Sequence, residues 1–102
     1  MMTSVGTDLI RVLADPLRLK IVTLLARETL CTTHLVEETG AKQTNLSNHM
    51  KVLREAGVVD TEPCGRFIYY KLRPEVLAGL SEQFAALAVS ARTASENKRA
   101  CP

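Results

Sequence analysis

The sequence has few of the residues from which catalytic sites and disulfide frameworks are usually built. Its 102 residues include two histidines, three cysteines, five glycines and no tryptophan. We find no Ser/His/Asp set, no paired carboxylates lining a cleft and no glycine-rich phosphate loop. Three cysteines cannot all pair within one chain. The composition therefore argues against an enzyme and against a disulfide-stabilised secreted domain.

Long hydrophobic runs are also missing. The longest uncharged apolar stretches, such as residues 84–91, are much shorter than the roughly 18–20 residues that a membrane-spanning helix needs. Residues 1–7 lack the basic start and the apolar block of a secretory signal. We therefore expect no membrane span, no secretion and a cytoplasmic location.

Length and charge indicate the class of partner. A chain of 102 residues forms one compact domain, and such a domain buries only about 60–68% of its unfolded surface, so we expect a dimer that covers more apolar area.

The net charge is +2, and the excess of basic residues lies in residues 41–73. The basic residues there are Lys42, Lys51, Arg54, Arg66, Lys71 and Arg73. A localised basic surface attracts polyanions, so a nucleic acid would bind this segment.

Hydrophobic periodicity predicts five helices. They span residues 7–13, 16–27, 32–39, 43–56 and 74–93. Asp15 and Pro16 supply an N-cap and a proline at the first position of the second helix. Gly40 ends the third helix shortly before the fourth begins. Two helices joined by a tight glycine turn indicate a helix-turn-helix.

The helix predicted over residues 43–56 has two contrasting faces. Leu46, Met50 and Leu53 recur at helical spacing and are expected to face the core. The opposite face carries Gln43, Thr44, Ser47, Asn48, Lys51 and Arg54. Amide and hydroxyl side chains read base edges in the major groove, while lysine and arginine hold phosphates. An ordinary solvated face is the alternative interpretation.

A two-stranded wing is predicted after this helix. One strand begins at Val58, a second spans residues 66–72, and Pro63, Cys64 and Gly65 form the turn between them. Arg66, beside the glycine, is placed to contact the DNA backbone or the minor groove. The predicted fold is therefore mainly α with a small β-wing, a winged helix-turn-helix.

The last predicted helix is expected to form half of an interface. Its apolar residues, at three- and four-residue steps, are Val76, Leu77, Leu80, Phe84, Leu87 and Ala88. The remainder of the chain shows no apolar period, which is typical of a mobile tail. We accordingly assign residues 1–93 to one domain for DNA binding and dimerisation, and residues 94–102, with Cys101, to a tail.

Three blocks of the sequence occur in the order found in one known family. They are ADPLR at residues 14–18, QTNLSNHMKVLREAGVV at residues 43–59 and GRFIYYKL at residues 65–72. With these blocks the chain resembles the ArsR/SmtB transcriptional repressors over about residues 8–92. The resemblance implies a homodimer formed by the first and last helices, bound to a two-fold symmetric operator and released by an effector.

The resemblance also implies which residues contact DNA. The residues that match or adjoin the family's base-reading and wing positions are Gln43, Thr44, Asn45, Ser47, Asn48, His49, Lys51 and Arg66. His49 has an equally plausible alternative role as a packed helix histidine bonded to backbone or to a neighbouring side chain.

The sequence specifies the effector less well than it specifies the DNA contacts. Zinc-sensing members carry Asp/His pairs on the last helix, but residues 74–93 contain no histidine. Arsenite-sensing members carry Cys-x-Cys before the recognition helix, and here Cys31 matches the first ligand while Thr33 replaces the second. The remaining thiols are Cys64 and Cys101, so we predict that Cys31, Cys64 and Cys101 bind arsenite, with cadmium or lead as alternatives.

Other interpretations of the thiols stay open. Cys31 could be a core hydrophobe, Cys64 a turn residue and Cys101 an incidental tail thiol. Oxidation of Cys31 with another thiol would make a redox switch. Cys31 with His34 could form a mixed site for nickel, cobalt or zinc. A dimer that binds another protein, and no DNA, is a further alternative.

Overall fold

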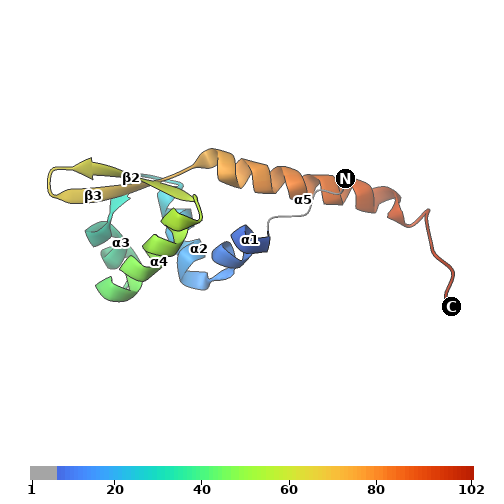
Figure 1. The fold of residues 1–102 in the computed structure, drawn as a ribbon, viewed down its shortest axis with the longest axis horizontal. Coiled ribbons are helices and arrows are strands. Elements are labelled where there is room, and N and C mark those ends of the chain that lie inside the picture. Colours follow the sequence, from blue (N-terminus) through green and yellow to red (C-terminus); the bar gives the residue numbers. More distant parts are fainter. Residues whose placement is uncertain (1–6) are drawn as a thin grey trace.

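A computed structural model describes residues 7–102, which form five helices and a small sheet (Figure 1). The helices are α1 (Thr7–Ala14), α2 (Pro16–Leu25), α3 (Thr32–Thr39), α4 (Gln43–Glu55) and α5 (Pro74–Ala94). The strands are β1 (Leu30–Cys31), β2 (Val59–Cys64) and β3 (Phe67–Leu72). The prediction of a mainly α winged helix-turn-helix is confirmed.

The core lies between α2, α3, α4 and the sheet. Leu46, Met50 and Leu53 of α4 are at most 1% exposed, as their helical spacing predicts. They pack with Ile21 of α2 and Leu35 of α3 in one hydrophobic cluster. Burial of this stripe turns the opposite face of α4 toward solvent.

The helix ends form where the sequence places cap residues. The Asp15 carboxylate accepts hydrogen bonds from the backbone N–H groups of Leu17 and Arg18, at 2.9 and 3.0 Å, and so satisfies two donors at the start of α2. Gly40 follows α3 with φ of 72°, a left-handed conformation that glycine adopts at least cost. The turn between α3 and α4 is thereby fixed.

The wing turns later than predicted. Cys64 pairs with Phe67, so Pro63 and Cys64 belong to β2, and the connection consists of Gly65 and Arg66. Gly65 has φ of 61°, as the first position of a tight two-residue hairpin loop requires. β2 is an edge strand, where the missing N–H of a proline is tolerated. The prediction of a turn at residues 63–65 is therefore wrong for its first two residues.

The sheet also has a third strand that was not predicted from the sequence. β1 pairs with β3, with Leu30 opposite Tyr70 and Cys31 opposite Tyr69, so the strand order is β1-β3-β2. Two residues are too few for a recognisable alternation. This short strand anchors the base of the wing to the start of α3.

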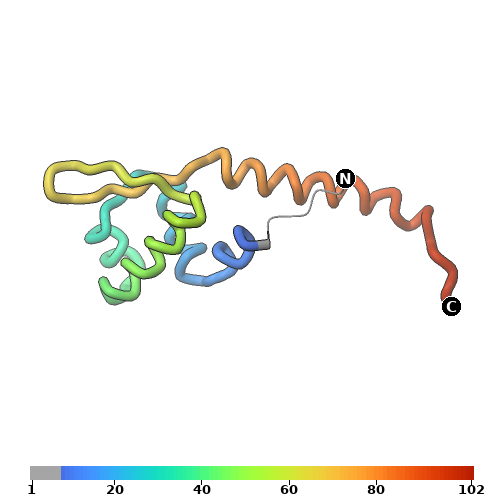
Figure 2. The backbone as a smooth tube through the Cα atoms, in the orientation of Figure 1, coloured from blue at the N-terminus to red at the C-terminus, as the bar shows by residue number. Residues whose placement is uncertain are grey.

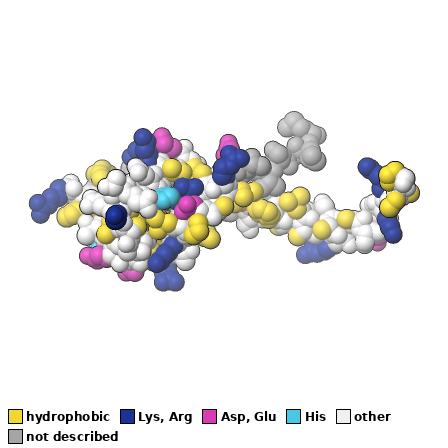
Figure 3. Space-filling view, turned by 90° about the horizontal axis from the view of Figure 1, so that it is seen from below, with side chains coloured by type: hydrophobic (Ala, Val, Ile, Leu, Met, Phe, Trp, Pro, Cys, Tyr) yellow, Lys and Arg dark blue, Asp and Glu magenta, His cyan; other side chains and the backbone are white. Residues whose placement is uncertain are grey.

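Helix α5 projects away from the rest of the chain, as Figures 1 and 2 show. Val76 and Leu77 of its first turns pack against the core, and beyond them the helix extends alone, which gives the described chain a long axis of 62 Å. Phe84 and Leu87 are 48% and 53% exposed. Hydrophobic side chains line this helix in the space-filling view (Figure 3). Within residues 7–102, the apolar row of α5 beyond Leu77 is thus left uncovered.

Two further predictions concern the start of the chain and membranes. Residues 1–6, which are part of the segment for which we predicted no secretory signal, lie outside the described residues. Among residues 7–102 there is no helix long and apolar enough to span a bilayer.

Candidate nucleic-acid interface

The polar face of α4 is open to solvent. The exposed residues are Gln43, Thr44, Asn45, Ser47, Asn48 and Lys51, six of the eight predicted DNA contacts. They lie on the second helix of the helix-turn-helix, opposite the buried stripe. The major groove, about 12 Å wide, admits an α-helix. This face can therefore enter a groove and present hydrogen-bonding side chains to base edges.

His49 differs from its neighbours on α4. It is half-buried, and its Nδ1 lies 3.0 Å from an Nη of Arg18. A guanidinium only donates, so Nδ1 is the acceptor and the ring proton resides on Nε2. The structure thus shows His49 bonded to a neighbouring side chain, one of the two roles considered from the sequence.

Arg18 connects His49 to the first helix. The Nε of Arg18 donates to the carbonyl of Val12 at 2.6 Å, near the end of α1, while its other end bonds His49 of α4. The hydrogen bond that the backbone N–H of Arg18 donates to the Asp15 carboxyl holds the pKa of that carboxyl below its usual range. Arg18, which lies in α2, therefore links α2 to both α1 and α4.

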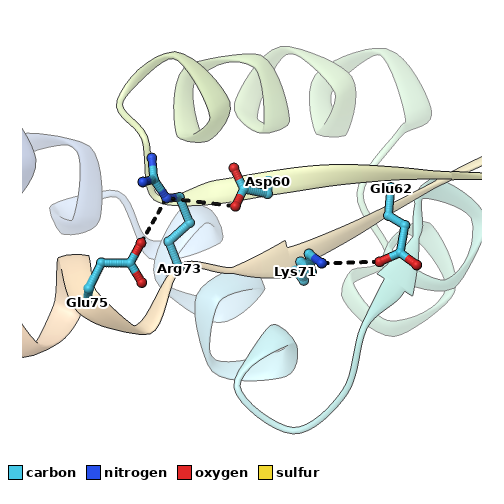
Figure 4. A network of polar contacts seen from close by, with 5 residues as sticks. All are labelled: Asp60, Glu62, Lys71, Arg73 and Glu75. Carbon is cyan, nitrogen blue, oxygen red and sulfur yellow. Dashed lines mark hydrogen bonds and ion pairs between the residues drawn. The ribbon is translucent and has the colours of Figure 1, made fainter.

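The basic residues of segment 41–73 fall into two groups. Lys71 pairs with Glu62 at 3.3 Å, and Arg73 pairs with Asp60 and Glu75 at 3.8 and 3.0 Å (Figure 4). Within residues 7–102, no carboxylate pairs with the others, which are Lys42, Lys51, Arg54 and Arg66. The expected basic surface is accordingly smaller than the number of basic residues suggests, and it lies on α4 and the wing tip.

Arg66 stands at the tip of the wing, directly after Gly65. Its guanidinium carbon lies 5.7 Å from the centre of the Phe67 ring, within the range of a cation–π interaction. Phe67 and Ile68 beside it are exposed. The tip therefore presents a cation and an apolar surface, a combination suited to contacts with a DNA backbone or minor groove.

Two grooves separate α4 from the wing and meet at Tyr70. The first is lined by Ser47, Asn48, Met50, Lys51, Arg54 and Tyr70. The second is lined by Cys31, Thr32, Thr33, Gln43, Arg66, Phe67, Ile68 and Tyr70. Sequence reasoning missed Tyr70, because strand alternation separates it from Tyr69 but does not show which of the two faces α4. Among residues 7–102, no acidic side chain lines either groove.

The three cysteines do not meet within one chain. All are free thiols; Cys31 is buried, and Cys64 and Cys101 are exposed. Cys31 pairs with Tyr69 and Cys64 with Phe67, on strands either side of β3, so their Cα atoms are on the order of 10 Å apart. Among residues 7–102, no group of three His, Cys, Asp or Glu side chains is placed to hold a metal ion.

His34 is also engaged. Its Nδ1 accepts a hydrogen bond from the backbone N–H of Cys31 at 3.2 Å. Its ring packs edge-on against the ring of Tyr69, with 5.8 Å between the two ring centres. Only Nε2 of this ring is then open to a ligand. The mixed site of Cys31 and His34 is therefore restricted to one nitrogen.

Comparisons with known proteins identify related sequences. The profile described as "Bacterial regulatory protein, arsR family" matches residues 15–61. The repressor SmtB of Mycobacterium tuberculosis H37Rv is 39% identical over 71 residues, 70% of this chain and 53% of that protein. The arsenic resistance regulator ArsR1 of Pseudomonas putida is 40% identical over 65 residues, 63% of this chain and 51% of that protein. The chain thus spans about half the length of these two relatives.

Other relatives are matched over more of their length. The arsenical resistance operon repressor of Staphylococcus xylosus is 38% identical over 71 residues, 70% of this chain and 68% of that protein. A crystal structure titled as a possible transcriptional regulator for arsenical resistance has 36% identity and a TM-score of 0.71, covering 78% of this chain and 83% of that one. The homodimeric winged helix-turn-helix domain of Mb0332 from Mycobacterium bovis has 25% identity and a TM-score of 0.65, covering 94% and 86%.

The bond between Arg18 and His49 generates a testable prediction. His49→Ala removes the acceptor and should lower the free energy of unfolding by about 1 kcal/mol, whereas His49→Asn retains an acceptor oxygen close to the position of Nδ1 and should lose less. Thermal or urea unfolding measures both. Equal losses in the two variants would show that the Arg18 bond contributes nothing.

Proposed function

The chain belongs to the arsR family of bacterial regulatory proteins, and on that basis we propose that it is a transcriptional repressor that binds operator DNA as a homodimer and is released by a thiophilic ion. The observation that carries the proposal is the exposed polar face of α4, free of carboxylates from Gln43 to Arg54. The family is one of regulators, in agreement with the prediction that the chain is not an enzyme.

The DNA-binding part of the proposal follows from how α4 is held. Gln43, Thr44, Asn45, Ser47 and Asn48 supply amide and hydroxyl groups for base edges, and Lys51 supplies a cation for phosphate. Arg66 reaches the flanking backbone or minor groove from the wing. The ring of His49 has only Nε2 left for a DNA contact, since Arg18 occupies Nδ1.

The homodimer is supported by α5. An exposed row that includes Phe84 and Leu87 favours burial against a partner surface, and the partly buried Leu9 and Val12 of α1 extend the apolar area. The similar Mb0332 domain is described as homodimeric. Two recognition helices would then enter successive major grooves about 34–36 Å apart on a two-fold symmetric operator.

Arsenite is our proposed effector, with cadmium, lead or thiol oxidation as the alternatives. Thiolates are the ligands that soft ions prefer, and Cys31, Cys64 and Cys101 are all free. Two of the related proteins are named for arsenic resistance. Because the thiols lie apart in one chain, ion binding would require the wing or the tail to move or a second protomer to supply ligands. Since Cys31 and Cys64 flank β3, such movement would reorient the wing against α4 and weaken DNA binding.

Operator binding is tested with a labelled duplex from the region upstream of the gene. Gln43→Ala should lower operator affinity about tenfold and reduce the preference for operator over random duplex, because the variant has no amide to bond a base edge. Lys51→Gln should weaken both complexes alike, and Lys20→Gln on α2 should change neither. Fluorescence anisotropy measures the affinities. Absent or salt-insensitive binding by the unaltered protein would contradict the DNA-binding proposal.

Dimer formation is tested on α5. Leu87→Glu places a charge in the exposed apolar row and should convert the dimer to a monomer in analytical ultracentrifugation, because burying an unpaired carboxylate costs several kcal/mol. Ala86→Glu, one residue away and turned about 100° around the helix axis, should remain a dimer. A Leu87→Glu protein that stays dimeric would place the interface elsewhere.

The thiol proposal is tested by titrating arsenite, cadmium, lead and zinc separately into the protein–operator complex. We expect arsenite to dissociate the unaltered complex. Cys31→Ser and Cys64→Ser should bind operator with unchanged affinity and no longer respond. An unaltered response in both variants would remove these thiols from the mechanism, and release by peroxide without any metal would support the redox alternative.

A further inference from the structure

A groove beside the recognition helix has the chemistry of an anion site. We call it the Tyr70 groove; its lining residues are Ser47, Asn48, Met50, Lys51, Arg54 and Tyr70. One wall is the solvent-facing side of α4 and the other is strand β3, with buried Met50 between them. All of its polar side chains can donate hydrogen bonds, and none is acidic.

The two cations of the groove are unpaired. Within residues 7–102, neither Lys51 nor Arg54 forms an ion pair or a side-chain hydrogen bond, and the hydroxyl of Tyr70 has no partner. The opposite face of β3 differs, because Lys71, the next residue after Tyr70, is neutralised by Glu62 (Figure 4). Among the described residues, Lys51 and Arg54 on the α4 side of the sheet are therefore unpaired cations, whereas Lys71 on the other side of β3 is paired.

Tyr70 is held rigidly in this groove. It pairs with Leu30 of β1 on one side and with Thr61 of β2 on the other, so β3 is the central strand at this position. Its half-buried ring packs against the hydrophobic core. The hydroxyl thus has a fixed position, and binding a ligand there would cost little conformational entropy.

The position of Arg54 along α4 favours a backbone phosphate as the ligand of the Tyr70 groove. From position 43 to position 54 the helix rises by about 16 Å, which exceeds the roughly 12 Å width of a major groove. When the amino-terminal residues of α4 contact base edges, the side chains near Arg54 lie at the bordering strand. Phosphate oxygens are the groups that arginine, lysine and tyrosine contact there.

We propose that the Tyr70 groove binds a phosphate of the operator backbone, with the Tyr70 hydroxyl donating to one oxygen while Arg54 and Lys51 neutralise its charge. This inference rests on the proposed DNA-binding function. It adds Tyr70 to the DNA-contacting surface predicted from the sequence, and it assigns Arg54, already placed on the polar face of α4, to a particular phosphate site shared with Tyr70. Together with Arg66 on the wing tip, the groove would hold the strand that passes between α4 and the wing.

The experiment measures how affinity for the upstream duplex depends on salt concentration. The variants are Arg54→Gln, Arg54→Lys, Tyr70→Phe and, as a matched control on the other face of β3, Lys71→Gln. The slope of log affinity against log salt decreases by about 0.9 for each phosphate that the protein no longer neutralises. Thermal unfolding of each variant verifies that it is folded.

The proposal expects a slope reduced by about 1 in Arg54→Gln, restored in Arg54→Lys and unchanged in Lys71→Gln. Tyr70→Phe should lose about threefold to tenfold in affinity at an unchanged slope, because it removes an uncharged donor. Equal slopes in Arg54→Gln and Lys71→Gln, or full affinity in Tyr70→Phe, would overturn the groove assignment while leaving the repressor proposal intact. No binding by the unaltered protein would overturn both.

Discussion

The burial of one face of α4 is the constraint on which the rest of the structure depends. Leu46, Met50 and Leu53 are withdrawn from water against α2 and α3, and burial of apolar surface is worth about 25 cal/mol per Å². The polar residues of α4 are therefore displayed to solvent as a consequence of core packing. Arg18 adds a polar link between α4 and α1, through its hydrogen bonds with His49 and with the carbonyl of Val12.

Residues 7–102 of the single chain form a closed hydrophobic core, but they do not by themselves cover α5 or bring the three thiols together. The core of α2, α3, α4 and the sheet is closed, whereas α5 carries an apolar row that nothing in residues 7–102 covers. The three thiols are likewise separated. Under the proposed function, two-fold symmetry and effector response would both depend on surfaces that a second protomer shares. Except for His49, the predicted DNA contacts of α4 are exposed in the single chain, whereas the proposed ion site is not assembled within residues 7–102.

Local signals predicted most of the fold. The residues that start and stop the helices, such as Asp15 and Gly40, placed each helix boundary within one or two residues of its observed position. Strand pairings between residues distant in the sequence were harder to predict. The two-residue strand β1 has no periodicity of its own and exists only because β3 offers it hydrogen bonds. The wing turn was displaced for the same reason, since the register of Cys64 with Phe67 decides where β2 ends.

The amino-acid sequence by itself determined the five helices, the family and the polar face of α4, because helical periodicity and capping act between residues close in the chain. Only the tertiary structure decided which cations are free and which are paired, that Nδ1 of His49 belongs to Arg18, and that Tyr70 borders the groove beside α4. These features depend on how strands and helices distant in sequence are brought together. Spacing along the chain does not record such distances, since the same residues could meet different neighbours in another packing.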